Sequence, residues 1–296
     1  MKAGAVLLLA ALTLAAQPRL LTNAKLETRS AALGLEREFR ALLAAEPQPA
    51  WIGWSVPSVR SYSLGCEYVS HDGWAAPGVI HLEPPDRAVI LFRVVNRSPE
   101  RIRALSPDCE IDAGGVPVHW LNDVKPPESV ALLAGLAADA EIAGNGALGA
   151  IAMHDDAAAD EALDRFAAAG QPEEIRRRAI GWLGSARGSH GLETLRSLLS
   201  GDASPALRVR TIGAIANSRQ PDALNLLIAT ARNDRDPQVQ RRAISALGNL
   251  PAGKGVPVLI EIAQTSKSVD MRKHAMNALQ QTHDPRALGF FEQVLQ

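Results

Sequence analysis

The chain has 296 residues and a formal net charge of −1, from 31 Lys and Arg against 32 Asp and Glu. This balance excludes a strong overall field that would select nucleic acid or an acidic surface. Hydrophobic residues make up 47% of the chain but aromatic residues only 4%. That composition favours closely packed helix pairs with small apolar side chains over a large β-sandwich core.

The first residues have the layout of a secretory signal peptide. Lys2 precedes an apolar run of roughly a dozen residues, and Ala15 and Ala16 close this run with small side chains. The run is too short to serve as a permanent membrane anchor. We expect residues 1–16 to be removed and the mature protein to be periplasmic or secreted. The alternative is a buried N-terminal helix.

Cys66 and Cys109 are the only cysteines of the chain. In an oxidising compartment an isolated pair is most simply a disulfide, and we predict one here. Two unpaired buried thiols remain an alternative, and a metal site made from two cysteines alone is less favoured.

The part of the chain before residue 125 is predicted to hold a helix and then a small β domain. The spacing of Leu35, Phe39 and Leu42 predicts an amphipathic helix over 27–46, within an N-terminal segment of residues 17–47. Short apolar runs separated by turn residues predict a disulfide-linked antiparallel β domain over 48–124; the runs are 78–83, 88–95, 101–106 and 116–121. Core packing is the favoured role of the tryptophans in this domain, and a ligand-stacking platform is the alternative; they are Trp51, Trp54, Trp74 and Trp120.

Residues 125–296 are predicted to form a helical repeat domain. One apolar pattern, at positions 0, 4, 5 and 8, recurs with a period of about 32 residues. Its first positions are Ile175, Leu207, Val239 and Met271, with a weaker copy at Ala143. A second apolar helix follows each copy, so we predict a mainly α fold: an α-solenoid of five helix hairpins.

The stretch V-x-R-R-A-I-x-A-L-G, which follows Asp236 and Pro237, resembles HEAT-like repeats, in particular the short variety named after phycobilisome lyases. The resemblance covers residues 143–296, and the whole chain looks like an exported bacterial HEAT-repeat protein with an N-terminal cap domain. The resemblance implies a binding scaffold whose first helices line the concave side, but it implies no particular chemistry.

Polar rows lie on the first helix of each repeat, away from the apolar stripe. Position 3 is cationic, position 6 is small and position 10 is polar. We predict that a partner binds Arg178, Arg210, Arg242, His274, Asn217, Asn249 and Gln281. Such a groove would suit a protein or an extended acidic ligand, because Arg makes bidentate contacts to carboxylates. The alternative is a solvated face with the arginines paired to nearby Asp residues. Position 1 is predicted to be a structural ladder between repeats; it holds Arg176, Arg208, Gln240 and Arg272.

Apparent chemical motifs are weak. GNGALG at 144–149 fits G-x-G-x-x-G, but it does not follow a strand, and Ala147 and Leu148 belong to the repeat pattern. A zinc site is the less favoured reading of the β-domain histidines, which lack short ligand spacings; the residues concerned are His71, His81 and His119 with Glu67 and Glu83. Turn and capping roles are favoured for HDD at 154–156 and HD at 283–284. We expect no metal or other cofactor.

These observations favour a non-catalytic, extracytoplasmic scaffold for protein–protein interaction, with no nucleic-acid partner and no membrane insertion after signal cleavage. One alternative is a lyase-like or hydrolytic enzyme with its site in or next to the β domain. Another is a structural envelope component. The last repeat offers no polar capping helix, so either Phe290 points outward or few apolar residues are left to expose. Self-association as a homodimer through this edge is favoured.

Overall fold

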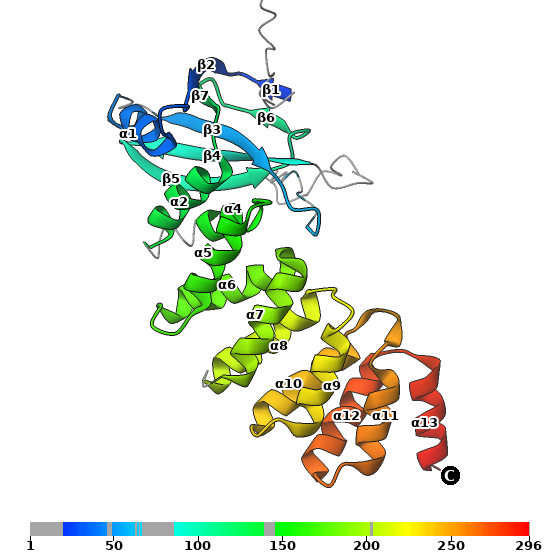
Figure 1. Cartoon of the computed structure of the whole chain (residues 1–296). Coiled ribbons are helices and arrows are strands. Elements are labelled where there is room, and N and C mark those ends of the chain that lie inside the picture. The colour runs from blue at the N-terminus through cyan, green and yellow to red at the C-terminus, as the bar shows by residue number, and fades with distance from the viewer. Residues whose placement is uncertain are drawn as a thin grey trace, which may run out of the picture.

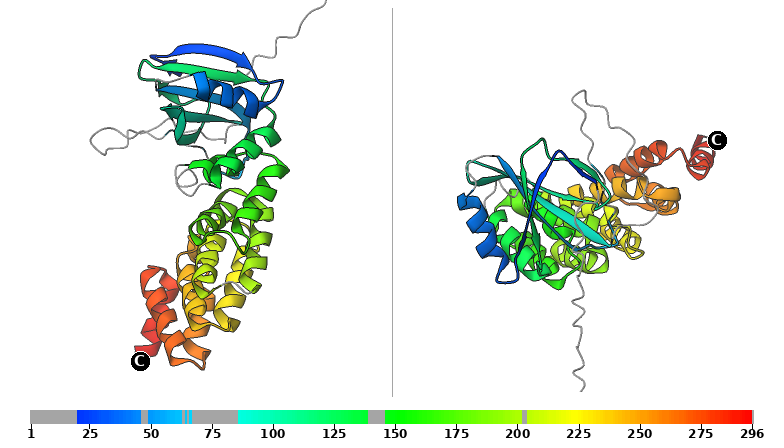
Figure 2. Two further views of the ribbon diagram at one scale, coloured as in Figure 1. Left: turned by 90° about the vertical axis from the view of Figure 1, so that its left-hand side faces the viewer. Right: turned by 90° about the horizontal axis from the view of Figure 1, so that it is seen from above.

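The structure is a computed structural model that describes residues 20–45, 49–62, 64, 66, 86–138, 146–201 and 204–295. The predictions for residues 1–16, for strand 78–83 and for Trp74, His71 and His81 lie outside these residues. A β-sheet unit stands at one end of the molecule, and a stack of helices leads from it to the C-terminus (Figure 1). Views from two further directions show the same elongated arrangement (Figure 2).

The β unit contains one mixed five-stranded sheet in the order β2-β7-β3-β4-β5. These strands are β2 (Lys25–Ser30), β7 (Pro117–Asn122), β3 (Ala50–Pro57), β4 (Arg87–Val95) and β5 (Ser98–Leu105). Strands β3, β4 and β5 are antiparallel, whereas β7 runs parallel to both β2 and β3. Asn96 and Arg97 both adopt positive φ between β4 and β5, as a tight hairpin turn requires. A separate parallel pair joins β1 (Leu20–Thr22) to β6 (Glu110–Asp112).

Two sequence predictions for this unit need correction. The sheet is not wholly antiparallel, because β2 lies beside β7 in parallel register. Residues 27–30 belong to that strand, so the helix predicted over 27–46 begins only at Leu35; it is α1 (Leu35–Ala45). Both β2, which joins the sheet, and α1, which packs on it through Phe39, precede residue 48.

Aromatic side chains hold α1 to the sheet. The ring of Phe39 lies 6.2 Å from that of Trp54 and 4.9 Å from that of Phe92, and Trp54 stacks on Phe92 at 5.0 Å. Trp54 and Trp120 are fully buried, which confirms a core role for both. Trp51 is half-buried, with the guanidinium of Arg93 5.4 Å from its ring centroid.

The predicted disulfide between Cys66 and Cys109 is present, with the two Cα atoms 5.3 Å apart. It packs beside Trp120, Val89 and Leu91, on the face of the sheet that α1 does not cover. The bond therefore links the segment after β3 to the segment between β5 and β6.

The helical part begins with α2 (Pro126–Ala137) and continues as five hairpins, as predicted. The hairpins are α4 (Leu148–Ala152) with α5 (Ala157–Ala167), α6 (Glu173–Ala186) with α7 (Gly188–Ser200), α8 (Pro205–Asn217) with α9 (Ala223–Asn233), α10 (Pro237–Gly248) with α11 (Val256–Thr265), and α12 (Val269–Gln281) with α13 (Pro285–Leu295). A 3-10 turn at Pro251–Gly253 joins α10 to α11. Ser204, Asp236 and Ser268 cap α8, α10 and α12, because each side-chain oxygen accepts a first-turn N–H.

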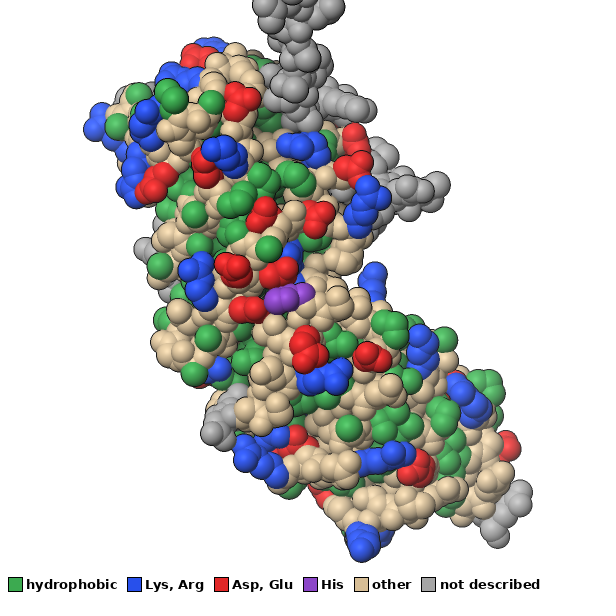
Figure 3. Space-filling model, in the orientation of Figure 1, with side chains coloured by type: hydrophobic (Ala, Val, Ile, Leu, Met, Phe, Trp, Pro, Cys, Tyr) green, Lys and Arg blue, Asp and Glu red, His purple; other side chains and the backbone are tan. Residues whose placement is uncertain are grey.

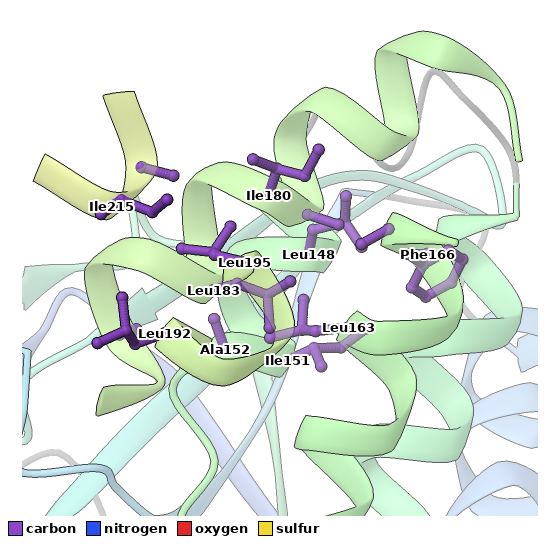
Figure 4. Close-up of a cluster of buried hydrophobic side chains, with 14 of the residues drawn as sticks. Leu148, Ile151, Ala152, Leu163, Phe166, Ile180, Leu183, Leu192, Leu195 and Ile215 are labelled. Atoms are coloured by element: carbon purple, nitrogen blue, oxygen red, sulfur yellow. The ribbon is translucent and has the colours of Figure 1, made fainter. Parts of the chain in front are cut away.

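The repeated apolar positions form one continuous core between the hairpins. In α10, for example, Val239, Ala243, Ile244 and Leu247 are fully buried. Side chains from α4 to α8 meet in the same way around Leu183 and Leu195 (Figure 4). Each repeat thus buries its apolar stripe against its neighbours, which is how solenoids gain stability.

The first helices of the hairpins form the more closely spaced layer. Helices α6, α8, α10 and α12 pack directly on one another, whereas the second helices α7, α9 and α11 hardly touch each other and pack mainly on first helices. In a curved stack, the layer with the tighter spacing is the concave one. The close packing of the first helices is what is expected of the concave layer to which the resemblance assigns them.

Phe290 in the last helix is buried, so the first of the two alternatives given for this edge, an outward-pointing Phe290, does not hold. Leu288 and Val294 are exposed instead, at 62% and 54% of their surface. None of the described helices is long and apolar enough to cross a membrane.

Candidate partner-binding face of the solenoid

Two arginines of the concave layer reach back across glycines of the preceding repeat. A methyl group placed on Gly181 in α6 would lie 3.1 Å from Nη2 of Arg210 in α8. A methyl group placed on Gly213 in α8 would likewise lie 3.1 Å from Nη2 of Arg242 in α10. The small residue at position 6 therefore makes room for the guanidinium at position 3 of the next repeat.

The position-3 side chains at the two ends of this row already have partners. Nε of Arg178 donates to Oε1 of Glu174 at 2.8 Å. Arg177 binds the same carboxylate, and its hydrogen bond, followed by that of Arg178, lowers the pKa of Glu174. Nδ1 of His274 lies 3.1 Å from the carbonyl oxygen of Asp270 and 3.5 Å from its carboxylate. At both ends of the row, a nearby carboxylate therefore contacts the position-3 side chain.

The two central arginines are different. Arg210 makes one long hydrogen bond, from Nε to the carbonyl oxygen of Arg177 at 3.4 Å. Among the described residues, Arg242 makes no hydrogen bond, and neither arginine has a carboxylate within ion-pair distance. Both side chains are exposed. Carboxylates therefore pair with Arg178 and His274, whereas the two central arginines are exposed and have no carboxylate partner among the described residues.

Polar amides lie near this row at the C-terminal ends of the first helices. Asn217 ends α8, Asn249 follows α10 and Gln281 ends α12, and all three side chains are exposed. Among the described residues their amides have no hydrogen-bond partner. Ser185, the equivalent residue of α6, donates instead to the carbonyl oxygen of Gly181 at 2.6 Å. Basic and acidic side chains are interspersed on the molecular face shown in Figure 3, so any charge recognition there is local.

An aromatic pair, which was not among the residues predicted from the sequence, extends the row toward the β unit. A methyl group on Gly149 would lie 2.8 Å from Cζ2 of Trp182, so Trp182 covers the position-6 glycine of repeat one. Its ring lies 5.7 Å from that of Tyr62, at 68°. The signal was available, because Trp182 stands where the other four copies have alanine: Ala150, Ala214, Ala246 and Ala278.

Tyr62 reaches the solenoid on the segment that follows β3. Within this segment, the backbone N–H of Val59 donates to the carbonyl oxygen of Met153 at 3.0 Å. Oγ of Ser61 donates to the carbonyl oxygen of Ala186 at 2.6 Å. The β unit and the second repeat therefore build the aromatic end of the row together.

The position-1 side chains form the structural ladder that was predicted. Each donates to a backbone carbonyl at the end of the preceding second helix: Arg176 to Ala167, Arg208 to Leu199, Gln240 to Arg232 and Arg272 to Ser266. Arg208 also binds the carboxylate of Asp234. Donors at helix C-termini satisfy the carbonyls that have no partner within the helix, and positive charges there interact favourably with the helix dipole. The position-1 side chains therefore make hydrogen bonds within the protein and have a structural role.

A buried polar network joins the β unit to the first repeat. Nε1 of Trp54 donates to Oγ of Ser129 at 2.8 Å, and Oγ of Ser129 lies 2.8 Å from Nε2 of His154. Nδ1 of His154 lies 2.8 Å from the carbonyl oxygen of Ala150. A carbonyl only accepts, so Nδ1 carries the proton and Nε2 accepts from Ser129.

This Ser–His contact is structural. Ser129 and His154 are both fully buried, so a substrate cannot reach them. Burial, with a smaller contribution from the charge of Arg187, lowers the pKa of His154 to about 4, although the hydrogen bond to Ala150 opposes this shift. The imidazole is therefore neutral at physiological pH. Asp156 has the capping role that was predicted, because its side chain accepts the N–H of Ala158 at the start of α5.

No group of three or more metal-ligating side chains comes together among the described residues. His119 is buried, with Nδ1 3.3 Å from a carboxylate oxygen of Glu27. His71, His81, Glu67 and Glu83 lie outside the described residues, as does the beginning of GNGALG. Leu148 and Gly149, the last residues of that motif, are helical.

Comparison with known proteins agrees with the helical architecture. Residues 159–236 and 224–296 match HEAT repeats, and no curated protein matches the chain. One similar solved structure is the complex of CpcE and CpcF of phycocyanin lyase from Nostoc sp. PCC7120. It is 24% identical and has a TM-score of 0.36, with 47% of this chain and 90% of that chain covered.

Another similar structure is human deoxyhypusine hydroxylase in complex with glycerol. It is 17% identical and has a TM-score of 0.30, with 58% of this chain and 74% of that chain covered. Together with the five stacked hairpins, the matched repeats establish the class of the helical part. Residues 159–296, the helical part from α5 onward, match HEAT repeats.

Proposed function

We propose that the protein is a non-catalytic scaffold that binds a protein partner through the concave face of its solenoid. The observation that carries this proposal is the pair Arg210 and Arg242, exposed and without a carboxylate partner in the described structure. Their equivalents at either end of the row, Arg178 and His274, are engaged by Glu174 and Asp270. The face therefore keeps two cations open at its centre.

The arrangement of these cations suits recognition of carboxylates. A guanidinium offers a planar set of N–H donors that can bind both oxygens of a carboxylate. Asn217 and Asn249 are on the same helices, and their amides can donate to and accept from a partner's backbone. A scaffold of this kind needs an acidic partner segment that extends over at least two repeats.

We also propose that the protein acts outside the cytoplasm. The signal-like N-terminal sequence and the disulfide between Cys66 and Cys109 support this location. N-terminal sequencing of the protein recovered from its native host should give a chain that begins near Gln17. Recovery of the chain with Met1 still in place would contradict the proposal.

The partner-binding proposal is tested with two double variants of equal charge. Arg210→Glu/Arg242→Glu reverses the concave pair, and Arg196→Glu/Arg232→Glu reverses two exposed arginines of the second helices α7 and α9. Each variant and the wild type are used to capture partners from the native host, and the captured proteins are quantified by mass spectrometry.

We expect the concave variant to lose partners that the control variant retains. High salt should remove the same partners from the wild type, because exposed charges are screened beyond about 8 Å at physiological ionic strength. Equal capture by both double variants would contradict a function of this face.

A further inference from the structure

We infer that the segment bound by this face is an acidic, proline-containing chain in the polyproline II conformation, with a carboxylate at every third residue. Its two carboxylates lie on Arg210 and Arg242, and a proline lies on Trp182 and Tyr62. This inference rests on the proposed function and specifies the chemistry of the partner.

The first step is that the three side chains form one row with the period of the repeats. Trp182, Arg210 and Arg242 each cover the position-6 glycine of the preceding repeat. They belong to α6, α8 and α10, which pack directly on one another. Packed helices lie about 8–10 Å apart, so the row offers one contact point about every 8–10 Å.

Only some backbone conformations repeat their side chains at this interval. A polyproline II helix has three residues per turn and rises about 3.1 Å per residue, so every third side chain recurs on one face after about 9 Å. A β-strand repeats its face after two residues, or about 7 Å. An α-helix has a pitch of about 5.4 Å. Of these three conformations, polyproline II therefore has the side-chain repeat closest to the spacing between neighbouring contact points of the row.

The third step concerns the end of the row nearest the β unit. Tyr62 and Trp182 meet edge to face and are both partly exposed. Pairs of aromatic side chains form the grooves that accept proline rings in polyproline II ligands. Such a ligand is already extended before it binds, so it loses less conformational entropy than a flexible acidic peptide.

The fourth step concerns the length of the ligand. Beyond Arg242 the next position-3 residue is His274, which lies against Asp270, and Arg241 also binds that carboxylate at 2.9 Å. On the other side, Arg178 is held by Glu174. Only two cations of the row are open, so the matched segment has one proline and two carboxylates, each three residues from the next.

The test uses labelled synthetic peptides and purified protein, with affinity measured by fluorescence anisotropy. The matched peptide contains PAPEAPE, and its reverse, EPAEPAP, covers the opposite chain direction. The control peptide, PAPEAEP, has the same composition and charge but places its glutamates two residues apart. A fourth peptide is helical and carries glutamates seven residues apart.

We expect one of the two period-three peptides to bind at least about tenfold more tightly than the control, which corresponds to 1.4 kcal/mol. Arg242→Ala should weaken this peptide by about tenfold, and Arg196→Ala should leave it unchanged. Tyr62→Ala should weaken the proline-containing peptide and leave a version with alanine at that proline unaffected. Circular dichroism checks that each variant is folded.

Three outcomes would overturn the inference: equal affinity for the control peptide, tighter binding of the helical peptide, or no binding of any peptide. Failure of the peptides while arginine-dependent capture persists would leave the proposed function standing. Loss of arginine dependence in the capture experiment would remove the proposed function itself.

Discussion

Nε of Arg187, between α6 and α7, donates to Oδ1 of Asp160 in α5 at 2.7 Å. The remaining N–H groups of this buried guanidinium donate to the carbonyl oxygens of Ala152, His154 and Asp156. One side chain thus satisfies four acceptors in the first repeat. Because these acceptors are at or near the buried turn between α4 and α5, Arg187 locks repeat two onto repeat one.

Replacing Arg187 should therefore destabilise the protein strongly. Arg187→Met keeps the bulk of the side chain but leaves the carbonyls and Asp160 unpaired, and breaking a buried ion pair costs about 3–5 kcal/mol. Since Asp160 is partly exposed, we expect a loss near 3 kcal/mol in urea denaturation. The control is Arg196→Met, whose exposed pair with Glu193 contributes at most about 1 kcal/mol. Similar losses of unfolding free energy for both variants would argue against a special role of Arg187 in joining the first two repeats.

The buried His154 should make stability depend on pH. Its pKa is lowered to about 4, mainly by burial, whereas the imidazole of an unfolded chain titrates near 6.5. Between these values the unfolded chain binds a proton that the folded chain does not. The free energy of unfolding should therefore fall as pH drops from about 6.5 to about 4, by about 3 kcal/mol in total, and level off below.

Denaturation curves at pH 7, 5.5 and 4.5 for the wild type and His154→Asn would measure this contribution. The variant lacks the titrating imidazole. Its free energy of unfolding should therefore fall less than that of the wild type as the pH drops from about 6.5 to about 4, and the difference should be most of the roughly 3 kcal/mol attributed to His154. Carboxylates with lowered pKa, such as Asp284 at about 2, lose their stabilising charge mainly below this window. Parallel pH curves for the two proteins would show that His154 is not the titrating group.

The helical repeats could be predicted from sequence because their evidence is local and recurs. The apolar positions of one helix, such as Val239 and Ile244, have equivalents one period away in either direction. Strand β2 could not be predicted in this way. All its residues are exposed, so it has no apolar alternation, and its partner Pro117–Asn122 lies about ninety residues further along the chain.

The candidate site was predicted only in part for a similar reason. Helix periodicity placed Arg210 and Arg242 on one face, but it could not show that Glu174 holds Arg178 while the central pair stays open. Tyr62 belongs to the segment after β3, and only the folded chain brings it to Trp182. Contacts between distant segments are fixed by tertiary packing, which a one-dimensional pattern does not encode.

The repeat interfaces should not tolerate a charge. Ile244 has no exposed surface, so Ile244→Asp places an unpaired carboxylate between packed helices and should cost at least about 3 kcal/mol. Asn225→Asp is the matched control, because Asn225 is exposed in the first turn of α9 and should change stability by less than about 0.5 kcal/mol. Thermal unfolding distinguishes the two, and an unchanged Tm for Ile244→Asp would contradict the assigned packing.

The disulfide should stabilise the β unit. Cys66 and Cys109 are 43 residues apart in the chain, and the loop-closure model gives up to about 4 kcal/mol for a bond of this span. The Cys66→Ser/Cys109→Ser variant should unfold at lower denaturant, and the wild type should show no free thiol when denatured without reductant. Two labelled thiols in the denatured wild type would contradict the bond.

Site-specific photo-crosslinking tests the central claim most directly. A photoreactive amino acid is placed at Asn217 or Asn249 on the concave face, or at Asn225 on the second-helix layer as a control. We predict that one partner is crosslinked from Asn217 and Asn249 but not from Asn225, and that the adducts disappear in Arg210→Glu/Arg242→Glu. Equal adducts from Asn225, or adducts that persist after charge reversal, would show that the concave arginine pair does not bind the partner.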